Sequence, residues 1–247
     1  MILINALRSL LFYIGYVFTM VLFSSSAMLI SPFSRRTSMR ICANWCQVAV
    51  EWARICCGIR YEIIGAENIP QSGCVVLAKH QSAWETLIVQ SLFYPAATVI
   101  KRELLSIPFF GWSIRLCDPI AIDREDAGAA LKAVVRGGTQ KIAEGRRVVI
   151  FPEGTRTMPG EENPDYSVGG AMLATQAKAL VLPVAINSGD CWPRGTLIKK
   201  PGLVRVVIGK PIDATGYKAK VLNAEVRDWI ESQMREISPA YGPKKSS

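Results

Sequence analysis

The longest uncharged stretch of the chain runs from Ser9 to Ser34, close to the N-terminus. A helix of about 20 mainly apolar residues crosses the hydrocarbon core of a bilayer, so this stretch is long enough to span one. Arg8 precedes it, and Arg35, Arg36 and Arg40 follow it. Because basic flanks favour the cytoplasmic side, the sequence predicts a membrane-attached helix with the rest of the chain in the cytoplasm.

A cleaved signal peptide is the alternative interpretation of the same stretch. One arginine, an apolar run and the small residues Ser24–Ala27 fit that pattern. The apolar run nevertheless continues through Met28–Ile30, where a cleavage region would usually turn polar. We therefore favour an uncleaved membrane helix.

A second helix is predicted from Met39 to Cys57, because Ser31-Pro32 interrupts the first. Its apolar residues recur at helical spacing, namely Ile41, Trp45, Val48, Trp52 and Ile55. Such an amphipathic helix can lie on the membrane surface or against the protein core. We expect residues 1–58 to form a membrane-anchoring helical hairpin.

The net charge of the chain limits the kinds of molecule that it is expected to bind. Lys and Arg outnumber Asp and Glu by 29 to 20, a net charge of +9. A basic surplus suits anionic lipid, a phosphorylated substrate or nucleic acid, but no nucleic-acid-binding motif is recognisable. The seven cysteines are irregularly spaced and there is one histidine, so we expect reduced thiols and no metal site.

From Tyr61 onward, strand-like and helix-like segments alternate. The predicted strands are Cys74–Ala78, Ala97–Lys101, Ile120–Asp123, Val148–Phe151, Val181–Ile186 and Leu203–Ile208. The predicted helices are Ser82–Leu92, Ala127–Glu144, Val168–Ala179 and Lys218–Ile237. This alternation predicts an α/β domain over residues 59–240, with a mixed, largely buried sheet flanked by helices. The tail after Pro239, and residues 241–247 above all, is expected to be disordered.

His80, the only histidine, lies between a predicted strand and a predicted helix. Ligands gather beyond the carboxyl ends of strands in α/β sheets, so His80 is a candidate catalytic base. Glu85 follows five residues later and can orient the imidazole. Ser82 and Glu85 also form a capping-box pattern, which is a purely structural role. The two roles are compatible, because one carboxylate oxygen can cap the helix while the other binds the imidazole.

Charged residues follow three further predicted strands. The segment Phe151–Arg156 follows one of them, and Gly154 permits a tight turn there. Lys101 and Arg102 end a second strand, and Arg124 follows a third. Strand ends that carry His, Glu and several cations predict a site for a phosphorylated substrate.

These motifs together resemble the glycerolipid acyltransferases typified by 1-acylglycerol-3-phosphate acyltransferase. His80 to Glu85 resembles the His-x4-Asp motif of that family, with Glu in place of Asp. The other motifs are matched by Lys101-x-Glu103-Leu104 with Ile122-Asp123-Arg124, by Phe151-Pro152-Glu153-Gly154-Thr155-Arg156, and by Leu182-Pro183-Val184. The resemblance runs in order from about Tyr61 to Lys210.

The resemblance implies transfer of a fatty acyl group from acyl-CoA or acyl carrier protein to the free hydroxyl of 1-acylglycerol-3-phosphate, giving phosphatidic acid. His80 would be the general base and Glu85 its orienting carboxylate, with direct transfer and no acyl-enzyme. The residues expected to bind substrate are Lys101, Arg102, Arg124, Glu153, Gly154, Thr155 and Arg156. No metal or prosthetic group is implied, and the expected location is the cytoplasmic face of a membrane, in particular the bacterial inner membrane.

Three alternatives remain at this point. A relative of the same family could acylate another lysolipid, such as a lyso-ornithine lipid. A lipid hydrolase could use Ser82 or a cysteine as nucleophile with His80 as base, although the chain has no Gly-x-Ser-x-Gly elbow. A non-catalytic membrane-binding module would not need a histidine beside an acid.

Overall fold

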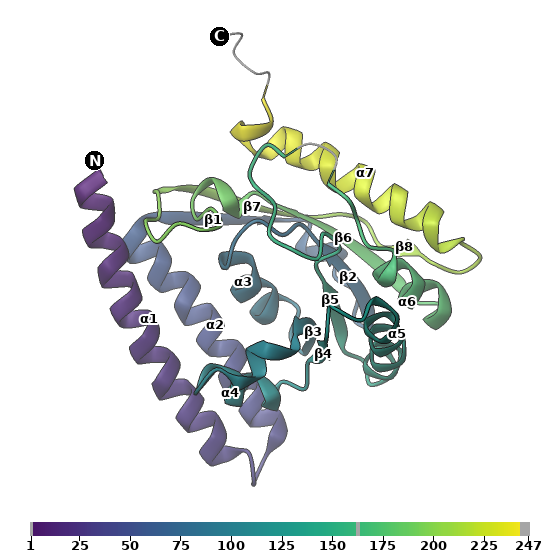
Figure 1. Cartoon of the computed structure of the whole chain (residues 1–247), viewed down its shortest axis with the longest axis horizontal. Coiled ribbons are helices and arrows are strands. Elements are labelled where there is room, and N and C mark those ends of the chain that lie inside the picture. Colours follow the sequence, from purple (N-terminus) through teal and green to yellow (C-terminus); the bar gives the residue numbers. More distant parts are fainter. Residues whose placement is uncertain (1, 162–163, 243–247) are drawn as a thin grey trace.

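The computed structural model describes residues 2–161 and 164–242 (Figure 1). Two helices, α1 (Ile2–Ile30) and α2 (Arg35–Cys57), form an antiparallel hairpin on one side of the molecule. Ser34 caps α2 by accepting a hydrogen bond from the Thr37 N–H, so α2 begins about one turn before the predicted start. Gly58 ends α2 in the left-handed conformation, with φ 70°.

The centre of the molecule is one eight-stranded sheet. Its strands are β1 (Ile59–Ile64), β2 (Cys74–Ala78), β3 (Ala96–Lys101), β4 (Ile120–Ile122), β5 (Arg147–Ile150), β6 (Leu180–Ile186), β7 (Gly202–Ile208) and β8 (Ile212–Asp213). The order is β1-β7-β6-β2-β5-β3-β4, with β8 paired to β6. The strands β6, β2, β5, β3 and β4 are parallel to one another, whereas β7 and β8 run antiparallel to β6. The predicted mixed α/β sheet is therefore confirmed.

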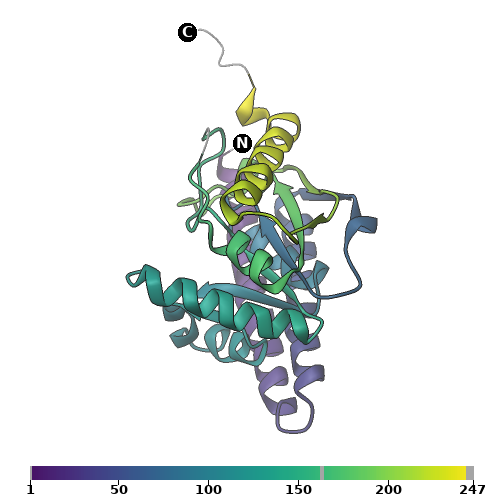
Figure 2. The ribbon, with the colours of Figure 1, turned by 90° about the vertical axis from the view of Figure 1, so that its right-hand side faces the viewer.

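Helices cover both faces of this sheet. The helices after the hairpin are α3 (Trp84–Leu92), α4 (Phe110–Leu116), α5 (Ala127–Ala143), α6 (Gly169–Ala177) and α7 (Ala219–Ile237). In Figure 2 the helices α5, α6 and α7 lie in front and the hairpin lies behind. Because side chains alternate along a strand, Val76 of β2 joins the core under α2 and α3, whereas Val75 and Leu77 join the core under α5, α6 and α7.

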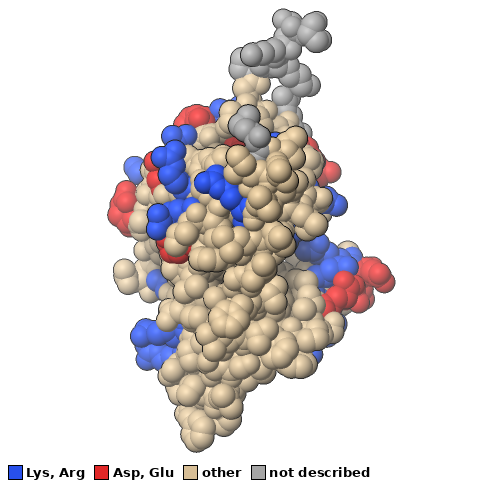
Figure 3. Space-filling model, turned by 90° about the vertical axis from the view of Figure 1, so that its left-hand side faces the viewer, with Lys and Arg blue, Asp and Glu red and all other residues tan. Residues whose placement is uncertain are grey.

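The outer face of α1 is apolar and exposed. Its exposed residues include Ile2, Leu3, Ile4, Leu7, Leu10, Leu11, Ile14, Val17, Phe18 and Leu22. Figure 3 shows that the lower part of this side of the molecule carries few charged side chains. Of the described helices, α1 alone is long and apolar enough to cross a membrane. An apolar surface of this extent indicates membrane association.

The second helix packs against the core. The Trp45 side chain is buried, and its indole N–H donates to the Thr19 hydroxyl of α1. The Trp52 indole N–H donates to the Phe12 carbonyl at 3.1 Å. Of the two placements that the sequence allowed for α2, the structure therefore shows the one against the core.

The expectation of disorder after Pro239 is wrong for Pro239–Tyr241, which form a short 3-10 helix. The Tyr241 hydroxyl accepts a hydrogen bond from Gln81, and its ring lies 5.9 Å from the Lys79 ammonium. These contacts tie the segment to the loop after β2. Residues 243–247 lie outside the described residues, and the division at residues 58 and 240 stays a prediction.

Candidate active site

Four parallel strands end at the edge of the sheet where the sequence motifs lie. The strands β2, β5, β3 and β4 are neighbours in that order, so their carboxyl ends meet at one edge. His80 follows β2, and the segment Phe151–Arg156 follows β5. Lys101 ends β3 and Arg124 follows β4. The structure thus brings three of the four sequence motifs to the same edge, whereas the fourth, Leu182-Pro183-Val184, lies buried within β6.

His80 and Glu85 are hydrogen-bonded, with 2.8 Å between Nδ1 and Oε1. The Glu85 side chain is fully buried, and the same Oε1 accepts the backbone N–H groups of Gln81 and Ser82 at 2.8 and 2.6 Å. The second oxygen, Oε2, accepts a hydrogen bond from the Ser188 hydroxyl. The carboxylate therefore has four donors, and this explains how it remains buried without a cation beside it.

The capping box is only half formed. The Glu85 carboxylate does accept the Ser82 N–H, as that pattern requires. The Ser82 hydroxyl, however, accepts from the Trp84 N–H at 3.0 Å, and Ala83 occupies the N-cap position of α3. The Ser82 N–H and the imidazole therefore both bind Oε1 of Glu85, whereas the sequence predicted one carboxylate oxygen for each of these contacts.

The imidazole of His80 is held on two sides. Its ring stacks on Phe151, with centroids 4.1 Å apart and planes at 20°. Because Nδ1 faces a carboxylate, the neutral ring carries its proton on Nδ1 and leaves Nε2 with a free lone pair. No hydrogen bond to Nε2 is formed by the described residues. Nε2 is therefore the atom that can accept a proton from a substrate.

Glu153 belongs to the same site, although its carboxylate faces protein groups. One oxygen accepts the His80 backbone N–H at 2.6 Å, and the other lies 3.2 Å from the Lys79 ammonium and accepts the Thr157 hydroxyl. The Thr157 N–H returns a hydrogen bond of 2.8 Å to the His80 carbonyl. The carboxylate thus joins the turn after β5 to the loop after β2.

A buried ion network supports this junction, and the sequence motifs did not reveal it. The Lys79 side chain is fully buried and bridges Glu153 to Glu231 of α7, at 3.2 and 2.7 Å. Tyr166 donates to the same Glu231 oxygen at 2.9 Å. Burial alone would lower the pKa of Lys79, but the two carboxylates raise it above its usual value. Burial raises the pKa of Glu153, and the Lys79 charge opposes that rise.

Gly154 and Arg156 shape the open side of the turn. Gly154 has a φ of +68°, a conformation that favours glycine, while a Cβ there would meet nothing within 4 Å. The need for glycine is therefore conformational. Thr155 is exposed, and the Arg156 guanidinium forms no ion pair with the described residues. The backbone segment that carries both residues is held next to the His80 loop, because the Thr157 N–H bonds to the His80 carbonyl.

The remaining predicted cations lie further along the edge. Lys101 pairs with Glu103 at 2.6 Å, and together with Arg102 and Arg115 they line a cavity of about 660 Å³. Neighbouring strands are about 4.8 Å apart, so the end of β3 lies roughly 10 Å from that of β2. Arg124 is exposed, beyond the end of β4. These cations form a second cluster, separate from the His80 pair.

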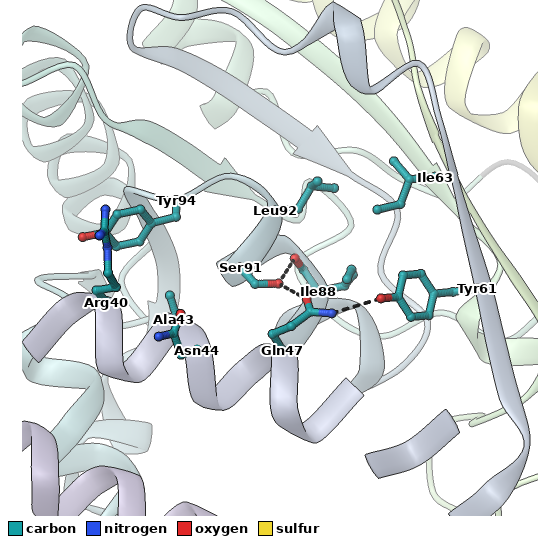
Figure 4. Close-up of a pocket in the computed structure, with 10 residues that line it drawn as sticks. All are labelled: Arg40, Ala43, Asn44, Gln47, Tyr61, Ile63, Ile88, Ser91, Leu92 and Tyr94. Atoms are coloured by element: carbon teal, nitrogen blue, oxygen red, sulfur yellow. Dashed lines mark hydrogen bonds between the residues drawn. The ribbon is translucent and has the colours of Figure 1, made fainter. Parts of the chain in front are cut away.

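Another cavity, of about 400 Å³, lies between α2, α3 and β1 (Figure 4). Gln47 donates to the Tyr61 hydroxyl at 3.0 Å and accepts from Ser91 at 3.1 Å. Neither His80 nor Glu85 lines this cavity. Its polar side chains largely satisfy one another, so it is not part of the catalytic constellation.

Metal-binding clusters are not found among the described residues, and all seven cysteines are free and buried. Burial raises the pKa of Cys74 to about 11 and that of Cys191 to about 11. These thiols are therefore poor nucleophiles at neutral pH.

Comparison with known proteins points to one family. The model of the family described as Acyltransferase matches residues 60–187. The chain is 41% identical to a 1-acyl-sn-glycerol-3-phosphate acyltransferase of Pseudomonas aeruginosa, over 96% of this chain and 93% of that protein. A protein of the same name from Borreliella burgdorferi is 28% identical over 73% of this chain and 74% of its own length. The crystal structure of the 1-acyl-sn-glycerophosphate acyltransferase PlsC from Thermotoga maritima has a TM-score of 0.81 and 25% identity, covering 94% of this chain and 95% of that one.

Proposed function

The chain belongs to the acyltransferase family, and we propose that it transfers a fatty acyl group from an acyl thioester to the free hydroxyl of 1-acylglycerol-3-phosphate. The product would be phosphatidic acid. The names of its relatives support this acceptor, since one of them is similar over nearly the whole chain. The observation that carries the chemistry is the 2.8 Å bond between His80 and the buried Glu85, with Nε2 left free.

In the proposed reaction Nε2 of His80 takes the proton of the acceptor hydroxyl as its oxygen attacks the thioester carbonyl. A new ester C–O bond forms, the C–S bond breaks, and the departing thiolate takes the proton from the imidazolium. Glu85 stabilises the imidazolium through Nδ1–H. Neither a metal nor a prosthetic group takes part in this scheme.

Direct transfer agrees with the position of Ser82. Its side chain is buried, and its hydroxyl oxygen accepts the Trp84 N–H at 3.0 Å. A serine-type hydrolase would need that oxygen accessible to substrate and hydrogen-bonded to Nε2, but among the described residues the Ser82 hydroxyl forms no hydrogen bond with His80. The hydrolase alternative therefore has no support in the geometry.

Arg156 is the proposed principal ligand of the acceptor phosphate. In 1-acylglycerol-3-phosphate only four bonds separate the reacting oxygen from phosphorus, which corresponds to about 5 Å at full extension. The cations beside His80 can reach such a phosphate most directly. Lys101, Arg102 and Arg124 lie further along the edge and suit the phosphates of the donor, since acyl-CoA and acyl carrier protein both carry a phosphopantetheine. Glu153, Gly154 and Thr155 shape the acceptor site through the turn.

We further propose that the enzyme works at the cytoplasmic face of a membrane, in particular the bacterial inner membrane. The apolar outer face of α1 supports contact with membrane lipids. The basic residues Arg35, Arg36 and Arg40 at the hairpin turn support the cytoplasmic side.

The decisive assay incubates the purified full chain with lysophosphatidic acid and either acyl-CoA or acyl carrier protein loaded with the acyl group. Formation of phosphatidic acid, lost in His80→Ala, is the expected result. A lyso-ornithine lipid in place of lysophosphatidic acid is the matched comparison. Faster acylation of the ornithine lipid would overturn the proposed acceptor while retaining the acyltransferase.

A further inference from the structure

The loop from Cys191 to Lys200, which leads into β7, lies beside the proposed phosphate site. The Lys200 N–H donates to the Cys191 carbonyl at 2.8 Å and so closes the base of the loop. Trp192 is buried in the core, while Arg194 near the tip is exposed. The loop is thus held at its base and presents one arginine at its tip.

Lys199 anchors this loop to α1. Its side chain is almost fully buried, and its ammonium lies 3.6, 4.1 and 4.6 Å from the ring centroids of Tyr13, Trp192 and Phe12. The Lys199 backbone N–H also donates to the Ser9 hydroxyl at 2.9 Å. Three aromatic faces around one cation give a specific, directional contact.

The charge of Lys199 has no carboxylate partner among the described residues. Its one side-chain hydrogen bond goes to the Leu197 carbonyl at 3.3 Å. Burial lowers the pKa of Lys199 to about 8, and the nearby Cys57 opposes that shift. The aromatic cage, formed by Phe12, Tyr13 and Trp192, is therefore the main compensation for the buried charge.

Arg194 reaches from the loop to the turn after β5. One of its terminal nitrogens, Nη1, donates to the Arg156 carbonyl at 2.9 Å and lies 3.5 Å from the Thr155 hydroxyl. Its other N–H groups form no hydrogen bond with the described residues. Neither Arg194 nor Arg156 forms an ion pair with the described residues. The Arg194 guanidinium therefore lies against the backbone of the turn that carries Arg156, where it can reach an anion bound at that turn.

We propose that Arg194 binds the acceptor phosphate together with Arg156, and that the cage around Lys199 holds the loop where this contact requires it. The inference rests on the proposed function and adds two residues that lie outside its four sequence motifs. A pair of guanidinium groups matches a phosphate monoester with two charges better than a zwitterionic or neutral headgroup. Arg194 would therefore help to select lysophosphatidic acid among lysolipids.

The test is steady-state kinetics of the full-length protein with lysophosphatidic acid and acyl donor varied in turn. Arg194→Ala is expected to raise the KM for lysophosphatidic acid about tenfold, the usual effect of losing a charged hydrogen bond, while kcat and the donor KM change by less than about threefold. Arg194→Lys should recover part of the affinity, since it keeps the charge but loses the fork. Arg136→Ala on α5 is the matched control, because Arg136 is also exposed and lies on a helix outside the proposed site.

Lys199→Met tests the anchor, since it keeps the length of the side chain and removes the charge. The expected result is the same selective rise in acceptor KM, with thermal unfolding measured alongside. Should that variant fail to fold, Arg194→Ala alone decides, because the exposed Arg194 is not needed for the core.

Different results would overturn the proposed function and the proposed role of Arg194. A wild-type protein that does not acylate lysophosphatidic acid would overturn the proposed function, whatever the variants do. An active wild-type enzyme with an unchanged acceptor KM in Arg194→Ala, or with an equal rise in both KM values, would overturn only the role of Arg194.

Discussion

The backbone N–H of His80 donates a 2.6 Å hydrogen bond to the Glu153 carboxylate, which lies 73 positions further along the chain. This bond joins the histidine loop to the turn after β5, and Lys79 holds the other carboxylate oxygen. The orientation of the proposed base thus depends on a buried ion network as well as on Glu85. The same network connects the site to α7 through Glu231.

His80→Ala is expected to lower kcat by a factor on the order of a hundred to ten thousand, the usual contribution of general-base catalysis. The substitution leaves the buried Glu85 with three protein donors, namely two backbone N–H groups and Ser188. We therefore expect the fold to survive, as circular dichroism and a thermal melt would show. Because the chain has one histidine, a variant with near-normal turnover would refute the mechanism.

Glu85→Gln is expected to lower kcat at least about tenfold, because the amide keeps the shape of the side chain but loses the charge that stabilises an imidazolium. Its oxygen can still accept from His80, and its NH₂ group can face the Ser188 hydroxyl, so thermal stability should change little. Glu85→Asp should be milder in kcat, since it retains the charge. Unchanged turnover in the Gln variant would reduce Glu85 to a structural role.

Arg156→Ala is expected to raise the KM for the acceptor more than that for the acyl donor. The physical reason is the loss of a guanidinium beside His80, where the acceptor phosphate would lie. Arg136→Ala is a suitable control, because Arg136 is exposed on α5, outside the proposed site. A selective effect on the donor would reverse the assignment of the two substrates.

Lys79→Met is expected to lower the free energy of unfolding by about 3 kcal/mol, because it leaves the Glu153 and Glu231 carboxylates buried without their cation. Glu231→Gln should cost less, since the amide oxygen can still accept from Lys79 and Tyr166. Chemical denaturation of both single variants and the double variant measures the coupling. Additive losses would show that the two residues do not act as a pair.

Replacing Leu10 and Phe18 on the outer face of α1 by Glu should weaken binding to phospholipid vesicles. Both side chains are exposed, at 58% and 68%, so the fold should not depend on them. Val221→Glu on α7, at 56% exposure, is the matched control. Vesicle flotation measures the bound fraction of the wild type, the Leu10/Phe18 double variant and the Val221 variant. Equal binding of all three would mean that this face does not contact the membrane.

Truncation of residues 1–38 is a less informative test of membrane contact than these surface substitutions. It would remove the fully buried Phe12 and uncover Trp45, whose ring packs against Tyr16 of α1 and Phe110 of α4. Trp45 would then be exposed by damage to the core, and residual binding to membranes would not report on the native surface.

The order of strands and helices after Tyr61 was predictable because buried strands are short apolar runs with charged or glycine-rich ends. Their boundaries moved by only a few residues in the structure. The helix α4 and the strands β1 and β8 were not predicted, since α4 and β8 are short and the pattern of β1 mixes charged with apolar residues. The reversed direction of β7 relative to β6 was likewise not predictable, because the apolar pattern of a strand is the same whichever way the strand runs in the sheet.

The sequence by itself determined the apolar first helix, the alternating strands and helices, and the motifs that place His80, Glu85 and the arginine turn at strand ends. These features are local, so the spacing and the types of the residues are enough to predict them. Only the tertiary structure decided how the charges are compensated. Lys79 meets Glu231 across 152 positions, and Ser188 meets Glu85 across 103. Burial makes such partners necessary, but which distant residues supply them depends on how the helices dock on the sheet.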